Sequence, residues 1–336
     1  MKKKLVLMFY FISTVCYSQT VDNTLKKATE NFYLKDYKGA ITDYDKVIKF
    51  NPKNAEAYLY RGMSKNRMGD EQGAMNDYNK TIEIKPTYSD AYWYRGNLKS
   101  YLKDYHGAIA DYTKLIEINS QNVNAYYNRA LAKDNLKDRQ GAILDYRKVI
   151  EIKPDYVYAY FSLAHIETDL GNKQKAMELY SMAIDMSPKN AEVYNRRAIL
   201  KGTLNDYSGA IADYTMAIEI DSKNEMAYLN RAAAKFNLED YQGAILDFNN
   251  LIEINPDNYF GYLNRGSTKW LLEDYRGAIQ DFNRVIEISP KNAEAYYYRG
   301  LSKILLKQKD SGCYDLSKSG ELGHPWAYTA IKERCN

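Results

Sequence analysis

The chain has 336 residues, with 47 Lys and Arg against 43 Asp and Glu, and a formal net charge of +4. Three of the positive charges belong to Lys2, Lys3 and Lys4, so the rest of the chain is close to neutral. A near-neutral chain lacks the basic patch that nucleic-acid binding requires, so we expect no nucleic-acid partner. Tyrosine is abundant, with 34 residues, and most of them recur at fixed positions.

Residues 1–18 have the features of a secretory signal. Lys2–Lys4 are followed by an apolar run over residues 5–15, and Cys16 and Ser18 supply the small residues of a cleavage site. The run is too short to span a bilayer, and no other stretch is apolar enough to cross one. We expect an exported protein that is periplasmic, secreted or at the cell surface. The alternatives are a buried helix, a short membrane anchor, or lipidation at Cys16, whose preceding valine fits the lipidation motif poorly.

A Gly-Ala dipeptide recurs every 34 residues over residues 39–278, with Lys175-Ala176 as the one variant. No insertion interrupts the period, and such a period is typical of repeat architectures rather than of globular domains. We number each unit from position 1 to position 34. The expected units are 21–54, 55–88, 89–122, 123–156, 157–190, 191–224, 225–258 and 259–292, an atypical ninth unit over 293–326, and a cap helix over 327–336.

The fixed positions predict two helices in each unit. Position 4 is Tyr in eight of nine units, position 8 is always small, and positions 20, 24 and 28 are Ala, aromatic and Ile in the first eight. Positions 4, 8 and 11 share one helical face, and positions 20, 24, 28 and 31 share another. The small residues allow close helix approach beside the rings. Asp or Asn at position 16 is expected to cap the second helix, and Pro at position 32 follows its end.

This pattern resembles the tetratricopeptide repeat (TPR), a 34-residue helix-turn-helix. The second unit carries the motif as Tyr58, Gly62, Ala74, Tyr78 and Pro86. The resemblance covers roughly residues 21–326. It implies an all-α fold, a right-handed α-solenoid (superhelix) of tandem TPR units with a C-terminal cap helix, and a non-enzymatic scaffold for protein–protein interaction.

Two charged positions depart from the TPR pattern. Position 7, usually leucine in the family, is Arg in seven units, and position 23 is Asp in eight. In the fifth unit both become leucine, as Leu163 and Leu179. We predict an ion pair between the two helices of a unit, replaced once by an apolar contact. Such a partly buried pair fixes register more than it adds stability. The alternative is a row of arginines that binds a ligand.

In TPR superhelices, positions 2, 5, 9, 12 and 13 of the first helix line an inner groove. These positions vary between the units of this chain, as expected of a recognition surface. We expect Trp93, Phe161, Phe236 and Trp270 to be exposed there, and large exposed apolar groups usually mark interaction sites. The predicted groove residues are Leu59, Trp93, Tyr101, Tyr127, Phe161, His165, Phe236, Phe260, Leu263, Trp270 and Tyr297.

The groove positions carry several acidic residues and one strong base, Arg67. The expected partner is therefore a protein or peptide segment with apolar anchors and basic flanks. Position 5 carries no lysine, so the carboxylate clamp of some TPR proteins is not expected. The alternatives are a structural or assembly subunit of an envelope complex, which docks through its convex face or its ends, and an accessory domain of an enzyme. The sequence leaves the oligomeric state open.

The remaining reactive side chains predict a disulfide and no catalysis. His106, His165 and His324 lie far apart in the repeat count, so no metal site, cofactor or catalytic triad is expected. Cys313 and Cys335 flank a turn rich in Gly and Pro, and antiparallel helices about this turn would bring them together. An oxidising compartment favours a disulfide between them. The alternative is two free thiols.

Overall fold

The computed structural model describes residues 21–335. All regular structure within this range is helical, and no strand occurs in it. The chain forms two compact units, of which the first ends at Ala159 and the second begins at Tyr160. The predicted signal and Cys16 lie outside the described residues.

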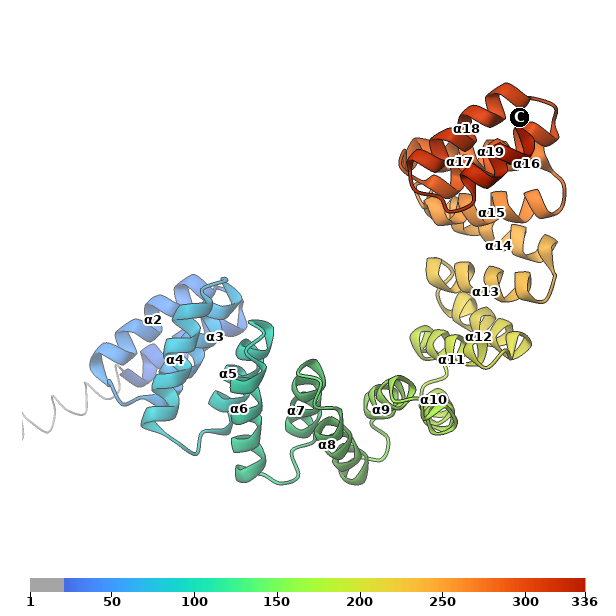
Figure 1. Cartoon of the computed structure of the whole chain (residues 1–336). Helices are drawn as coiled ribbons and strands as arrows, with labels where there is room; N and C mark the ends of the chain where they lie inside the picture. Colours follow the sequence, from blue (N-terminus) through green and yellow to red (C-terminus); the bar gives the residue numbers. More distant parts are fainter. Residues whose placement is uncertain (1–20, 336) are drawn as a thin grey trace, which may run out of the picture. The chain divides into compact units, whose positions relative to one another are not determined.

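The helices follow one another in pairs, each with a first helix (helix A) and a second helix (helix B) joined by a short turn (Figure 1). The A helices are residues 21–33, α3 Ala55–Arg67, α5 Ser89–Tyr101, α7 Val123–Asn135, α9 Val157–Asp169, α11 Ala191–Thr203, α13 Glu225–Asn237, α15 Tyr259–Leu271 and α17 Ala293–Leu305. The B helices are α2 Tyr37–Phe50, α4 Glu71–Ile84, α6 Tyr105–Ile118, α8 Arg139–Ile152, α10 Lys173–Met186, α12 Tyr207–Ile220, α14 Tyr241–Ile254, α16 Tyr275–Ile288 and α18 Lys309–Glu321. The short helix α19 spans Ala327–Arg334.

Within each compact unit, a helix packs mainly against its neighbour along the chain. Successive A helices also approach one another, as α11 does with α13 and α15 with α17. We call the surface that the A helices share the A-face. No helix in residues 21–335 has the length and apolar character needed to cross a bilayer.

The small residues at positions 8 and 20 allow the two helices of a repeat to approach closely, as predicted. A methyl group added at Gly62 would lie 2.8 Å from a ring carbon of Tyr78, and Tyr78 and Ala74 are both 0% exposed. Gly266 is equally close to Phe282, at 2.9 Å. The ring at position 24 therefore fills the space that the small residue at position 8 leaves.

The Gly-Ala dipeptide is explained by the N-terminal cap of helix B. The carboxylate of Asp36 accepts a hydrogen bond of 2.9 Å from the backbone N–H of Gly39, at position 19. A Cβ on Gly39 would lie 2.2 Å from this carboxylate, so a side chain there is incompatible with the cap. The same cap occurs at Asp70, Asp104, Asp138, Asp206, Asp240 and Asp274.

The predicted cap is wrong in the fifth repeat. Asn172 makes no side-chain cap, and its amide instead donates to Glu167 at 2.7 Å. Lys175 stands there in place of the glycine that the cap requires. The loss of the glycine and the loss of the cap therefore occur together.

The predicted ion pair is confirmed and extends further than expected. Arg61 donates to both carboxylate oxygens of Asp77, at 2.9 and 2.5 Å, and Lys65 lies 2.8 Å from Asp77. The third guanidinium nitrogen of Arg61 donates to Asp45 of the preceding repeat at 2.6 Å. The guanidinium also lies over the Tyr58 ring, 5.2 Å from its centre. The other bidentate pairs are Arg95–Asp111, Arg129–Asp145, Arg197–Asp213, Arg231–Asp247, Arg265–Asp281 and Arg299–Asp315.

These contacts occupy all three nitrogens of each arginine, which argues against the alternative of a ligand-binding row. Every such arginine also donates to position 25 of the preceding repeat, as Arg231 does to Thr215 at 3.0 Å. The arginine therefore joins three helices: its own helix A, its own helix B and the preceding helix B.

The fifth repeat replaces this network with a different one. Leu163 and Leu179 are 3% and 8% exposed, as an apolar replacement predicts. Glu167 takes the position of the lysine at position 11, is 1% exposed, and forms an ion pair with Lys175. The residue pattern did not predict this reversed pair, although positions 11 and 19 change together in the fifth repeat.

The last helix continues the repeat register. Helix α19 begins at Ala327, one period after α17 begins at Ala293, so α19 takes the place of a further helix A. Cys313 in α18 and Cys335 at the end of α19 form a disulfide, with Cα atoms 5.8 Å apart. The predicted disulfide is present, and it fastens α19 to α18.

Candidate functional site

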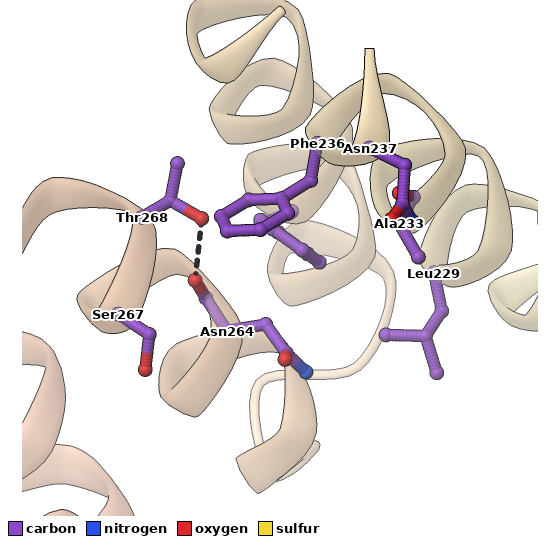
Figure 2. A pocket seen from close by; sticks show the side chains of 8 residues that line it. Leu229, Ala233, Phe236, Asn237, Asn264, Ser267 and Thr268 are labelled. Atoms are coloured by element: carbon purple, nitrogen blue, oxygen red, sulfur yellow. Dashed lines mark hydrogen bonds between the residues drawn. The ribbon is translucent and has the colours of Figure 1, made fainter. Parts of the chain in front are cut away.

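A pocket of about 290 Å³ opens on the A-face of the second compact unit, between α13 and α15 (Figure 2). It is lined by positions 5, 9, 12 and 13 of the seventh repeat and by positions 6, 9 and 10 of the eighth. Phe248 of α14, at position 24, lies at its base and is 3% exposed. The other lining residues are Leu229, Ala233, Phe236, Asn237, Asn264, Ser267 and Thr268.

Phe236 is the large exposed ring of this pocket. It lies near the C-terminal end of α13, is 38% exposed, and contacts Tyr241 edge-on at 5.2 Å between ring centres. Figure 2 shows its ring projecting toward Thr268 and Asn264 of the neighbouring helix, with Leu229 on the other side. The ring therefore forms a wall of the pocket and leaves its interior open.

The polar side chains of the pocket bond to carbonyl groups of their own helices. Asn264 donates to Phe260 O at 2.8 Å, and Asn237 donates to Ala233 O at 2.8 Å. Thr268 likewise donates to Asn264 O at 2.7 Å (Figure 2). The two amide oxygens accept no hydrogen bond from the described residues. No lining residue is charged. A largely apolar lining with a few polar groups is typical of binding pockets.

The A-face is more polar earlier in the second compact unit. Arg196 donates to Glu192 at 2.7 Å, and the side-chain oxygen of Asn195 is buried without a hydrogen-bond partner among the described residues. Burial raises the pKa of the nearby Tyr180 hydroxyl, which a hydrogen bond with Thr168 partly offsets.

Aromatic rings cover the A-face again at the C-terminal end. Trp270 meets Tyr298 at 5.5 Å between ring centres, Tyr298 meets Tyr297 at 5.3 Å, and Tyr297 stacks on His324 at 4.1 Å. Burial lowers the pKa of His324, so its imidazole is neutral at pH 7. Within residues 21–335, no three His, Cys, Asp or Glu side chains gather to hold a metal ion.

The eleven predicted groove residues differ in their exposure. Tyr101, Phe260 and Phe236 are exposed, at 73%, 48% and 38%. Leu59 and Leu263 are buried, at 2% and 8%, and pack in core clusters, so their expected place on an open surface is corrected. His165 and Tyr297 are half-buried.

The expected exposure of Trp93, Phe161 and Trp270 is also corrected, because all three are half-buried. Position 5 points partly toward the ring at position 24 of the same repeat. The ring centres are 6.2 Å apart in both Trp93–Tyr112 and Phe161–Tyr180, and 5.6 Å apart in Tyr127–Tyr146. Trp270, at position 12, lies under Tyr298. Position 5 thus belongs half to the core.

The pocket brings together one residue of the predicted set, Phe236, with several residues outside that set. Asn264 and Thr268 occupy positions 6 and 10, outside the groove positions expected from the resemblance. The signal that could have located the pocket is the combination of rings at positions 12 and 24 of the seventh repeat with Asn264, instead of a tyrosine, at position 6 of the eighth.

Family models match most of the repeat region. A model described as tetratricopeptide repeat matches residues 89–122, 123–156, 157–190, 191–224 and 227–258. A second, described as TPR repeat, matches residues 30–69 and 271–303. The chain belongs to the tetratricopeptide repeat family. TPR proteins bind protein or peptide partners and generally serve as non-catalytic scaffolds, so this TPR chain is a scaffold for protein–protein interaction.

Solved TPR structures resemble this chain. The crystal structure of MamA is 27% identical, covers 49% of this chain and 96% of its own, and has a TM-score of 0.47. A tetratricopeptide repeat protein from Parabacteroides merdae ATCC 43184 is 20% identical, covers 84% of this chain and 97% of its own, and has a TM-score of 0.45. The pilF protein of Pseudomonas aeruginosa is 17% identical and has a TM-score of 0.52. The match covers 63% of this chain and 96% of the pilF chain, and it supports the fold alone. No curated protein matches the chain.

Proposed function

We propose that this TPR chain binds an extended peptide segment of a partner protein along the A-face. The observation that carries the proposal is the pocket between α13 and α15, which is open, uncharged and lined by Phe236, Leu229 and Phe248. A solenoid offers a long surface rather than a closed cavity, and a peptide is the guest that can follow such a surface. The pocket supplies the place where an apolar side chain is anchored.

The charges of the A-face favour basic residues beside the anchor. Glu192 and Glu294 lie at position 2 of α11 and α17, in the same compact unit as the pocket, and both are exposed. An exposed carboxylate is only partly neutralised by a neighbour such as Arg196 and can still attract a cation. Rim charges of this kind mainly set the association rate and the specificity.

We also propose that the chain acts outside the cytoplasm. The basic and apolar start of the sequence supports export, and the disulfide between Cys313 and Cys335 is typical of an oxidising compartment. A lipid anchor at Cys16 is the alternative form of the same localisation. Each proposed unit, from 21–54 to 293–326, would then present one helix A to an extracytoplasmic partner.

A second candidate function is a structural subunit that docks through the B helices. The observation that favours it is a pair of exposed leucines at position 22: Leu144 in α8 is 66% exposed and Leu246 in α14 is 62% exposed. Both point to solvent from the B helices.

Peptide selection separates the two candidates. A random peptide library displayed on phage is selected against the chain, and a selected peptide is synthesised with a fluorophore for polarisation measurements. Phe236→Ala should weaken binding at least about tenfold, the loss of roughly 1.4 kcal/mol expected for an anchor contact. Leu246→Ala, in the same repeat, is the matched control and should leave binding unchanged. Both side chains are exposed, so circular dichroism should show unchanged helicity. If Leu246→Ala weakens binding and Phe236→Ala does not, the peptide binds the surface of the B helices rather than the A-face.

A further inference from the structure

We infer that the pocket between α13 and α15 takes an aromatic side chain of the guest peptide, which completes a three-ring cluster that the chain builds elsewhere from its own residues. This inference rests on the proposed function and specifies the anchor that the pocket selects.

The complete cluster occurs in the first and the eighth repeat. In the first repeat, Tyr60 stacks on Tyr44 at 6.1 Å and meets Phe32 at 5.4 Å between ring centres. In the eighth, Tyr298 stacks on Phe282 at 5.9 Å and meets Trp270 at 5.5 Å. In both clusters the outer rings come from positions 12 and 24 of one repeat. The middle ring comes from position 6 of the next.

The seventh repeat supplies the outer rings without the middle one. Phe236 stands at position 12 and Phe248 at position 24, but position 6 of the following repeat is Asn264. The pocket of about 290 Å³ lies where the middle ring would be, and these three residues line it. The same positions that make a closed cluster in two repeats therefore make an open pocket in this one.

An asparagine at position 6 does not by itself need a guest. At the third repeat, Asn128 donates to Asn97 at 3.1 Å, and Asn97 also accepts from the Tyr112 hydroxyl at 2.8 Å, so a polar network forms within the chain. The pocket has no such network. Phe248 stands at position 24 in place of Tyr112 and has no hydroxyl, and Ala233 stands at position 9 in place of Asn97. Asn264 donates to a carbonyl of its own helix.

The charge and polarity of the pocket fit a neutral ring. No charged side chain lines it, so a charged guest group would lose its hydration without gaining a partner. An aromatic ring gains the stacked and edge contacts that Tyr60 and Tyr298 make. The amide oxygens of Asn237 and Asn264 can accept from the main-chain N–H of the guest or from a phenol hydroxyl. Phenylalanine and tyrosine are therefore the anchors that fit.

Capped amino acids test the inference directly. Binding of N-acetyl-L-phenylalaninamide, with N-acetyl-L-alaninamide and N-acetyl-L-lysinamide as controls, is followed by saturation-transfer NMR. The phenylalanine compound should bind with a Kd of roughly millimolar order, and the other two should not. Asn264→Tyr supplies the missing ring and should weaken binding at least tenfold. Asn230→Tyr makes the same change at position 6 one repeat earlier and should not weaken it.

The outcomes separate this inference from the proposed function. Equal binding of the phenylalanine compound to the native chain and to Asn264→Tyr would overturn the inference. If Asn264→Tyr does not fold, Ala233→Leu narrows the pocket from α13 and carries the same expectation. A selected peptide that binds the A-face without an aromatic residue would overturn the inference and leave the proposed function standing. If the phenylalanine compound binds but no selected peptide binds the A-face, the inference about the pocket holds and the proposed function is overturned.

Discussion

At the scale of single residues, the buried aspartate at position 23 organises each repeat. Asp247 is 1% exposed and accepts two hydrogen bonds from Arg231, at 3.0 and 2.6 Å. It also forms an ion pair with Lys235, whose ammonium nitrogen lies 2.8 Å from its carboxylate. Burying a carboxylate with two cations carries a desolvation cost. Removing one partner costs more, because the remaining charge is then buried without a counterion. The network therefore fixes how helix A lies on helix B more than it adds stability.

Removing one partner should cost more than replacing both. Asp247→Ala should lower the free energy of unfolding by about 3 kcal/mol, because Arg231 and Lys235 lose their counterion. The double variant Arg231→Leu with Asp247→Leu copies the pair found in the fifth repeat and should recover part of that loss, since only Lys235 is then left without its counterion. Urea denaturation of both variants measures the difference. A double variant less stable than Asp247→Ala would contradict this account.

The pocket makes an independent prediction about stability. Asn264→Tyr should raise the free energy of unfolding by about 1 kcal/mol, because the new ring stacks on Phe248 and meets Phe236 as Tyr298 does with its neighbours. Thermal denaturation of the variant, compared with Asn230→Tyr, checks the sign. A lowered midpoint would show that the space between α13 and α15 cannot hold a ring.

Residue patterns predicted the ion pair because the charges at positions 7 and 23 change together. They did not predict the pairing of Glu167 with Lys175. The two residues stand at positions 11 and 19, which form no ion pair with each other in the other described repeats. They also overestimated the exposure of Trp93 and Phe161, because a helix face alone does not show how far the position 24 ring of helix B reaches under position 5.

At the scale of elements, the periodicity predicted the helix pairs, since each has its own apolar face. The turn between the paired helices was not predictable in the same way. Its residue at position 15 has a left-handed backbone in each described repeat, with φ of 64° at Lys35 and 82° at Gly69. Most repeats place a non-glycine residue there, so composition alone gives no signal of this conformation.

The cap of helix B predicts that the effect of Gly243→Ala on the free energy of unfolding changes sign when the cap is removed. Gly243→Ala in the native chain should be destabilising by about 1 kcal/mol, because its methyl group would lie 2.0 Å from Asp240 and break the cap. After Asp240→Ala removes the cap, the same Gly243→Ala change should stabilise by up to about 1 kcal/mol through higher helix propensity. A double-mutant cycle in urea measures both values. Equal effects of Gly243→Ala in the two backgrounds would rule out the steric conflict.

At the scale of the whole molecule, a tandem array derives its stability from contacts within repeats and between neighbours. Arg231 shows how the two are linked, since it bonds to Asp247 in its own repeat and to Thr215 in the preceding one. The 34-residue period predicted a repeat architecture, and the TPR-like residues at its fixed positions implied the family and the scaffold role. The pocket did not, because it depends on which of two adjacent repeats supplies a ring.

Alkaline pH should unfold the chain through its buried tyrosines. Burial raises the pKa of Tyr44 from 10.0 to about 12 and raises the pKa values of Tyr112 and Tyr214 as well. The folded state thus favours the neutral phenol, so this stability is full below about pH 10 and is lost as pH rises toward 12. Absorbance at 295 nm and circular dichroism should change together. Complete ionisation of tyrosine with helicity retained would contradict the prediction.

The measurement that tests the central claim most directly is photo-cross-linking of a library-selected peptide that carries a benzophenone group. Mass spectrometry of the cross-linked chain should locate the adducts on the A-face, at Leu229, Phe236 or Ser267 of α13 and α15. Adducts confined to the exposed side of α14, around Leu246, would show that the guest binds the B helices and would contradict the account.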